Sequence, residues 1–314
     1  GGEKGAVIDW AKGEEGAMAR CGDPQAVPID RGVVEAYNAI AAELEPTLTE
    51  ALGSGTAVAG SRLYPGLTAV GRRQWVRFNI RIFRQMFAPM ERLQRLIPGS
   101  LIVSLGARSI SRYLGRMLGL LARRVLGQYD PALLGHGPVE TNSLILVEPN
   151  LQAWAQKDSL PVDELRRWLA MHEMTHAWEF RAHPWLQAYM EGLLSEVLIG
   201  NLADGHRPNA LELIRTLTVG VGQQWKAITR LQAAMSLLEG YSNLVMNDIG
   251  RRHLPHCGLL EAAYRRRQEQ RTPLERAFLR LTGMEMKMRQ YVQGERFCRE
   301  VRDAGGPELL SRVW

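Results

Sequence analysis

Cysteine is scarce in this sequence. The 314-residue chain has only Cys21, Cys257 and Cys298, and none of them forms a CxxC pair. A disulfide framework and a thiolate metal cage are therefore not expected. This usage favours a reducing compartment, so we expect a cytoplasmic protein. No signal peptide is recognisable, and the start at Gly1 without methionine indicates a processed or engineered N-terminus.

Long apolar runs are also missing. No stretch of about 18 consecutive apolar residues occurs, so we expect no membrane-spanning helix. The most apolar segment, Leu101–Gly127, carries five arginines, which are costly in lipid. Its Gly115 and Gly119 form a GxxxG pattern that we interpret as close packing of a soluble helix. Hydrophobic residues are 46% and charged residues 23% of the chain, which excludes disordered and collagen-like proteins.

Lysine is rare as well, because 34 of the 39 basic residues are arginines, and the formal net charge is +6. Arginine suits phosphate, so this bias raises nucleic acid as a partner. The arginines, however, are spread along amphipathic segments together with Glu and Asp, and clusters at 123–124 and 265–267 are short. We interpret them as solvated helix faces and expect no nucleic-acid partner.

Apolar residues recur every three or four positions along most of the chain, which predicts a mainly α protein, α+β at most. The best strand candidate is Ser143–Val147, which Pro149 ends. A link rich in glycine and proline suggests a helical N-terminal domain, 1–138, and a C-terminal domain, 139–314, with the chemistry. The predicted helices cover 33–52, 74–97, 101–126, 162–180, 185–199 and 210–248, with two more before the end.

The most informative motif is HExxH at residues 172–176, inside a predicted helix. Residues four apart lie on one helix face, so His172 and His176 can both bind one zinc ion. Glu173 is placed to contact a water near the metal without binding the metal itself, which suits a general base. The helix face that carries both histidines also carries Leu165, Trp168 and Leu169, which are apolar. We therefore expect the histidines to point inward.

A catalytic zinc normally has a third protein ligand. Metzincins have glycine and histidine where this chain has Glu179 and Ala182, so that subclass is excluded. A glutamate on a later helix is the other option. Glu196 lies 20 residues after His176, but Gly200 stands where an acidic partner is expected one turn later.

Glu239, 63 residues after His176, is the competing candidate. Its surroundings, Leu238–Asn243, resemble the segment that supplies the third ligand in several glutamate zincins. Asn243, one turn later, could accept a hydrogen bond from a histidine N–H. The residues alone leave both glutamates open, with Glu239 favoured.

Most of the chain, from about residue 74 to the end, is similar to a known family. The chain resembles the zincin-like hydrolases that have been associated with deazaflavin-coenzyme biosynthesis, a group of largely unknown activity. The segments that carry the resemblance are 125–130, 146–150, 168–180, 184–186, 238–240 and 287–297. The pathway association is not transferred to this chain.

The resemblance implies a zincin-like metallopeptidase fold with a separate helical N-terminal domain. It also implies Zn²⁺ as cofactor, with His172, His176 and Glu239 as ligands and Glu173 as base. Tyr241 stands where many relatives are expected to have histidine.

One further position is a candidate for a contact with the substrate. Zinc peptidases commonly bind the developing oxyanion with Tyr, His or Arg, and Tyr291 lies in a segment that carries the resemblance. Glu148 closes the predicted strand, and zincins often align an extended peptide along a strand edge.

We therefore expect a zinc-dependent hydrolase, a metallopeptidase that cleaves a peptide or small amide bond with zinc-activated water. The alternative is a catalytically inactive zincin-fold protein with a binding or regulatory role. Glu173 favours the enzyme, because a purely structural zinc site has no use for that carboxylate.

Overall fold

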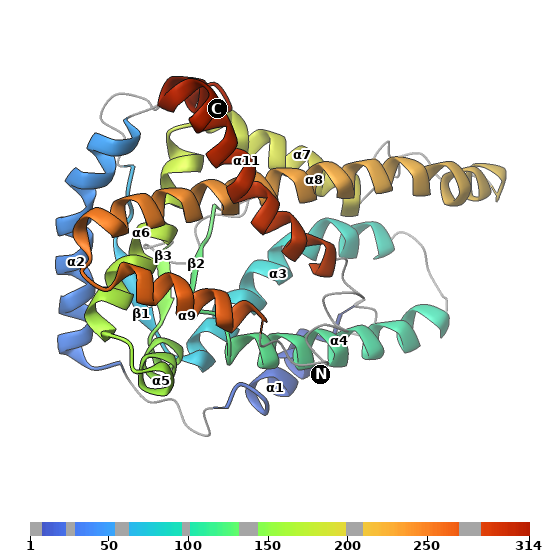
Figure 1. Cartoon of the computed structure of the whole chain (residues 1–314). Coiled ribbons are helices and arrows are strands. Elements are labelled where there is room, and N and C mark those ends of the chain that lie inside the picture. Colours follow the sequence, from blue (N-terminus) through green and yellow to red (C-terminus); the bar gives the residue numbers. More distant parts are fainter. Residues whose placement is uncertain are drawn as a thin grey trace. The chain divides into compact units, whose positions relative to one another are not determined.

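The computed structural model describes residues 8–22, 29–53, 63–95, 101–131, 144–198, 210–269 and 284–314. These residues are mostly helical, and one small sheet accompanies the helices, as predicted (Figure 1).

The chain forms two compact units, each built from two stretches of sequence. The first unit combines Gly1–Ala41 with Gly66–Trp154, and the second combines Ala42–Pro65 with Ala155–Trp314. The domain boundary predicted between residues 138 and 139 lies outside the described residues, so the division at that point stays a prediction.

Within the described residues, the first unit contains the sheet and three complete helices. Its elements are α1 (Trp10–Met18), β1 (Leu67–Val70), α3 (Arg72–Arg95), α4 (Leu101–Ala122), β2 (Gly127–Tyr129) and β3 (Leu144–Val147). The second unit is helical, with α6 (Val162–Arg181), α7 (Pro184–Leu198), α8 (Ala210–His253), α9 (Cys257–Glu269) and α11 (Met284–Ser311). Two helices, α2 (Arg31–Leu52) and α5 (Glu148–Asp158), contain the points at which the units divide.

The predicted helices match α2, α3, α6 and α7 to within two residues at each end. Helix α4 ends four residues earlier than predicted, and α8 continues to His253. Strands β1 and β2 were not predicted, because three or four residues are too few to establish an alternating pattern. Pro149 lies in the first turn of α5, where proline is tolerated because the first helical N–H groups have no intrahelical partner.

Strand β3 lies in the middle of the sheet, whose order is β1-β3-β2. It pairs in parallel with β1, from Leu67 opposite Leu144 to Val70 opposite Val147, and antiparallel with β2. All four β3 residues are buried, which explains their unbroken apolar run. Both edges of β3 are thus already hydrogen-bonded, so an extended peptide cannot pair with this strand.

Small residues allow α4 to pack closely against α1. Gly115 faces the backbone of Gly13, and a Cβ atom on Gly119 would lie 2.7 Å from the carbonyl oxygen of Ala17. The GxxxG pattern thus lies where two helices of one unit pack closely, and the close packing expected there is confirmed. The apolar side of α3 contributes Trp75 to the same core.

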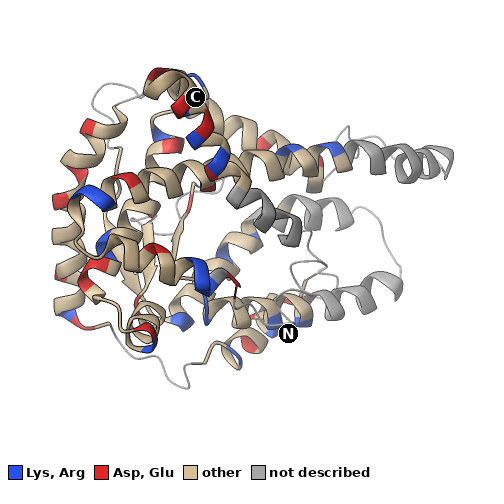
Figure 2. Cartoon of the chain, in the orientation of Figure 1, with Lys and Arg blue, Asp and Glu red and all other residues tan. Residues whose placement is uncertain are grey.

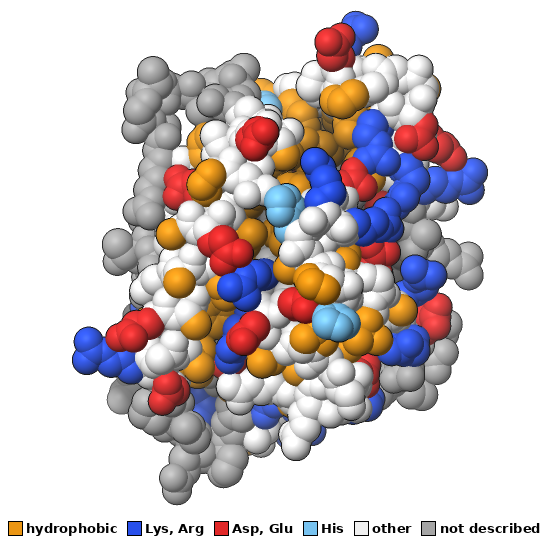
Figure 3. Space-filling view, turned by 60° about the vertical axis from the view of Figure 1, so that its left-hand side comes forward, with side chains coloured by type: hydrophobic (Ala, Val, Ile, Leu, Met, Phe, Trp, Pro, Cys, Tyr) orange, Lys and Arg blue, Asp and Glu red, His pale blue; other side chains and the backbone are white. Residues whose placement is uncertain are grey.

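Charged residues of both signs are distributed over the helices, whereas the three strands carry none (Figure 2). Acidic and basic side chains also lie next to one another on the face shown in Figure 3. In the second unit, the Arg251 guanidinium donates to both carboxylate oxygens of Glu261 at 2.8 Å. Within the described ranges, no helix has both the length and the apolar character needed to cross a membrane.

Replacing Gly115 by alanine is expected to lower the free energy of unfolding by about 1–3 kcal/mol, because the added methyl group would overlap with the Gly13 backbone. Gly192 on α7 is the matched control, since a Cβ atom there meets nothing within 4 Å. Gly192→Ala should stabilise the protein by up to about 1 kcal/mol through helix propensity. Urea denaturation followed by circular dichroism measures both free energies of unfolding. Equal changes in the two variants would contradict the close packing of α4 against α1.

Candidate metal centre

Helix α6 carries the HExxH motif and is buried on most of its sides. It follows Pro161, has Asp163 and Glu164 in its first turn and ends with Arg181, so its terminal charges complement the helix dipole. It packs against α7, α8 and α9. Polar side chains inside such an enclosed helix require partners, because an unpaired buried polar group is costly.

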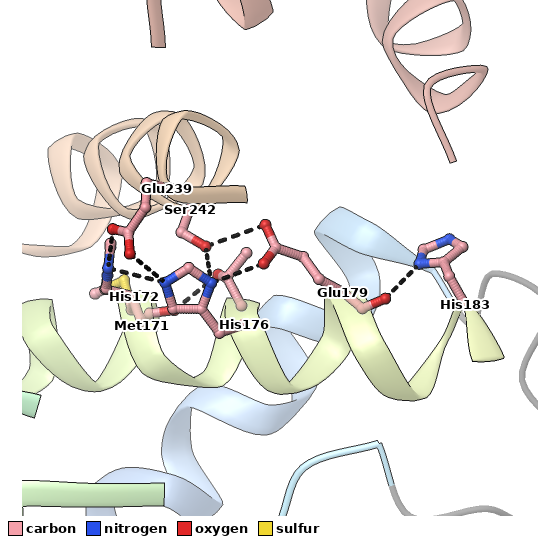
Figure 4. A network of polar contacts seen from close by, with 8 residues as sticks. Met171, His172, His176, Glu179, His183, Glu239 and Ser242 are labelled. Carbon is pink, nitrogen blue, oxygen red and sulfur yellow. Dashed lines mark hydrogen bonds and ion pairs between the residues drawn. The ribbon is translucent and has the colours of Figure 1, made fainter. Parts of the chain in front are cut away.

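Helices α6 and α8 bring three predicted ligands together (Figure 4). The Nε2 atoms of His172 and His176 are 3.2 Å apart. From α8, Glu239 places Oε2 at 3.5 Å from His172 Nε2 and Oε1 at 3.9 Å from His176 Nε2. One donor atom from each residue lies within 4.8 Å of the other two.

These separations suit a single zinc ion. Two ligand atoms at 2.0–2.1 Å from a tetrahedral zinc are about 3.3 Å apart, which is close to the distances within this cluster. Two imidazole nitrogens and one carboxylate oxygen are also a donor set typical of catalytic zinc sites. The Glu239 side chain is 23% exposed, against 11% for His172 and 13% for His176, so Glu239 is the most exposed of the three.

The other candidate ligand lies elsewhere. Glu196 is exposed on α7, and it is not among the described acidic and histidine residues that converge in this cluster. The structure therefore brings Glu239 to the histidines and leaves Glu196 on the surface.

Two further predicted residues lie on the helices of this region. Asn243 is buried one turn after Glu239, but its Oδ1 atom has no hydrogen-bond partner among the described residues. Tyr291 belongs to α11, and its side chain lies outside the described residues.

Tyr241 has a packing role. Its ring stacks on that of Trp178, with centroids 5.7 Å apart and planes inclined by 18°. The Trp314 ring meets Tyr241 edge-on at a centroid distance of 5.0 Å. Burial raises the pKa of the Tyr241 hydroxyl, and the nearby charge of Glu179 adds to that effect. Tyr241 therefore belongs to an aromatic cluster beside the ligands.

Glu173 is buried next to the ligands, with 6% of its surface exposed. Burial raises the pKa of its carboxyl group, positive charge on His172 and His176 opposes this change, and the charge of Glu239 adds to it. The residue is thus a carboxyl group enclosed beside two imidazoles, where proton transfer is sheltered from bulk water.

Glu179 and Ser242 are functional candidates that the sequence analysis missed. The Nδ1–H group of His176 donates to Glu179 Oε2 at 2.7 Å, since an ionised carboxylate can only accept. Ser242 Oγ donates to Glu179 Oε1 at 3.2 Å and lies 3.1 Å from His176 Nδ1 (Figure 4). This arrangement orients the ring so that Nε2 faces the ligand cluster. The signal was present, because Glu179 lies one helical turn after His176.

The site stabilises positive charge at His176. Burial alone would lower the pKa of this imidazole, but the charge and hydrogen bond of Glu179 oppose that effect. Together with the charges of Glu239 and Glu173 they raise the pKa to about 10. Carboxylates on both sides of an imidazole thus create an environment that favours a cation.

The chain is similar to known proteins in both sequence and fold. A family model described as zincin-like metallopeptidase matches residues 8–314. The chain is also similar to a crystal structure from Chloroflexus aurantiacus, described as "a putative hydrolase with a novel fold". That similarity has 36% sequence identity and a TM-score of 0.73, and it covers 98% of this chain and 91% of the other. No curated protein matched, and neither of the two similarities concerns deazaflavin coenzymes.

Glu179→Gln is expected to weaken zinc binding by about 10- to 100-fold, because the variant loses the charged acceptor that orients His176. Competition with a chromophoric chelator measures this affinity. Glu164→Gln is the control, since Glu164 lies on the same helix and binds His256 at 2.7 Å, away from the ligands. An unchanged affinity in Glu179→Gln would contradict the assigned role.

Proposed function

The chain belongs to the zincin-like metallopeptidase family, and from this premise we propose that it is a zinc-dependent hydrolase that cleaves a peptide or small amide bond. The observation that carries the proposal is the convergence of His172, His176 and Glu239 beside the buried carboxyl group of Glu173. The proposed location is cytoplasmic, in keeping with three cysteines that are buried and free.

His172, His176 and Glu239 would hold the zinc ion through the donor atoms that already face one another. Zinc supplies Lewis acidity: it lowers the pKa of a bound water and polarises a carbonyl group. Glu179 keeps the proton of His176 on Nδ1, so that Nε2 is available as a ligand.

Asn243 is the proposed partner of the other histidine. The Nδ1 atom of His172 and the Oδ1 atom of Asn243 are both buried, and neither has a hydrogen-bond partner among the described residues. When Nε2 of His172 binds a metal, its proton must reside on Nδ1, which then needs an acceptor. The carboxamide oxygen of Asn243 has the required chemistry.

Glu173 acts as general base and then as general acid. It accepts a proton from the attacking water and returns that proton to the nitrogen of the leaving amine. Its enclosed position beside both histidines supports this role over that of a binding protein, because a metal site that only holds the fold together needs no such carboxylate.

Tyr291 is the proposed donor to the oxyanion. It lies one helical turn before Gly294, and Gly294 contacts the backbone of Gly240, the residue that follows Glu239. Tyr291 is therefore three residues from the point at which α11 contacts α8, the helix that carries Glu239. A phenolic O–H group can donate to a developing negative charge.

Glu173→Gln is expected to keep its zinc and lose hydrolysis, with kcat lower by at least about 10²-fold, because the amide cannot take a proton from water. A peptide library analysed by mass spectrometry gives the turnover, and elemental analysis gives the zinc content. Glu196→Gln serves as the control, because Glu196 is exposed on α7. Wild-type turnover in Glu173→Gln would refute the assigned role.

Tyr291→Phe is expected to lower kcat by about 10²- to 10³-fold, because one donor to the oxyanion is lost. The change removes only the hydroxyl group, so zinc content and KM should stay near the wild-type values. Steady-state kinetics on the best library substrate measures both constants. A higher KM at unchanged kcat would assign Tyr291 to substrate binding instead.

A further inference from the structure

Helices α8 and α11 meet without side chains between them at one point. Gly294 of α11 lies against α8 so closely that a Cβ atom on it would be 3.5 Å from the Gly240 Cα and would overlap with the carbonyl group of Ser236. A Cβ atom on Gly240 would in turn overlap with the backbone of Gly294 and Glu295. Any side chain at either position therefore forces the two helices apart.

The two helices run alongside each other in the same direction beyond this point. Gly294 contacts Ser236 and Gly240, and eight residues later Arg302 forms an ion pair with Asp248 of α8. Cys298 lies between these two anchor points on α11 and is fully buried. Helix α11 thus supports the stretch of α8 that contains Glu239.

Glu239 and Gly240 are consecutive residues on α8, so they point in directions about 100° apart around the helix. Glu239 points toward the histidines of α6, and Gly240 meets α11. Helix α8 is therefore in contact on two sides, with α6 next to Glu239 and with α11 at Gly240.

We propose that Gly240 and Gly294 are positioning residues of the metal centre, whose backbone contact holds Glu239 at the distance that zinc binding requires. This inference rests on the proposed role of Glu239 as ligand. Metal–ligand distances tolerate deviations of only about 0.2 Å. Accommodating a methyl group would move the backbones apart by about 1 Å, given a normal carbon–carbon contact of about 3.5 Å.

Gly294→Ala tests the proposal, because Gly294 is on a helix that supplies none of the three proposed ligands. We expect zinc affinity, measured by chelator competition, to fall at least about tenfold, as for other residues that orient metal ligands. The visible absorption of the cobalt-substituted protein should change as well, since it reports ligand geometry. A loss of fold stability alone would change neither the zinc affinity nor the cobalt spectrum of the molecules that remain folded.

Two matched glycine variants serve as controls. Gly192→Ala places a methyl group in open space, and Gly115→Ala creates a comparable overlap in the first unit. Both should keep the wild-type zinc affinity and cobalt spectrum, although Gly115→Ala lowers the melting temperature. The proposal is overturned if Gly294→Ala loses stability like Gly115→Ala but binds both metals as the wild type does.

Hydrogen exchange in the wild-type protein gives a second test that does not depend on whether a variant folds. Zinc should slow exchange at residues 294–302 more than at residues 111–122 of α4, because binding at Glu239 restrains the contact with α11. Equal slowing of exchange in both segments would contradict the proposed link between the metal centre and α11. Failure of the wild type to bind zinc would overturn the proposed function as well, whereas normal zinc binding with an unaffected Gly294→Ala removes this inference alone.

Discussion

The packing of α6 against α8 encloses an unusual concentration of ionisable groups, and the proposed chemistry depends on it. Three carboxyl groups, those of Glu173, Glu179 and Glu239, surround the imidazoles of His172 and His176. Buried carboxylates are costly unless a positive charge or hydrogen bonds compensate them. Two histidines compensate part of this charge, and a divalent cation at their facing Nε2 atoms would compensate more. The charges around the two imidazoles and the geometry of the donor atoms therefore both favour a bound cation.

The surrounding structure can be understood as a set of constraints on that arrangement. Glu179 and Ser242 orient His176 from behind, so the tautomer suits a metal ligand. Gly240 lets α11 approach the helix that carries Glu239. Burial of α6 on most of its sides, His172 included, encloses the ligands. Each constraint acts on a ligand through a neighbour, which is how metal sites achieve precise geometry.

The helices and the pair of histidines could be predicted from local patterns. A spacing of four residues places His172 and His176 on one face of a helix whatever the rest of the fold does. The third ligand could not be derived in this way, because Glu196 and Glu239 both lie on helices and differ only in which face packs against α6. The similarity of Leu238–Asn243 to the ligand segment of glutamate zincins, rather than spacing, favoured Glu239. Glu179 was overlooked because its position was used only to exclude another subclass.

Short and non-local features were the least predictable. Strands β1 and β2 are too short to show a period, and they became recognisable only through their pairing with β3. The two compact units each combine separate stretches of the chain, which no linear reading of composition indicates. The close contact of Gly240 with Gly294 likewise joins residues 54 positions apart. Glycine in a helix signals such contacts only once the partner helix is known.

The central claim is that His172, His176 and Glu239 hold one zinc ion. The most direct test is the metal content, by mass spectrometry, of the wild type and of His176→Ala, Glu239→Ala and Glu196→Ala. The account predicts about one zinc per chain in the wild type and in Glu196→Ala, and its loss in the other two variants. A wild-type protein that holds no zinc after reconstitution, or a Glu239→Ala variant that retains it fully, would contradict the account.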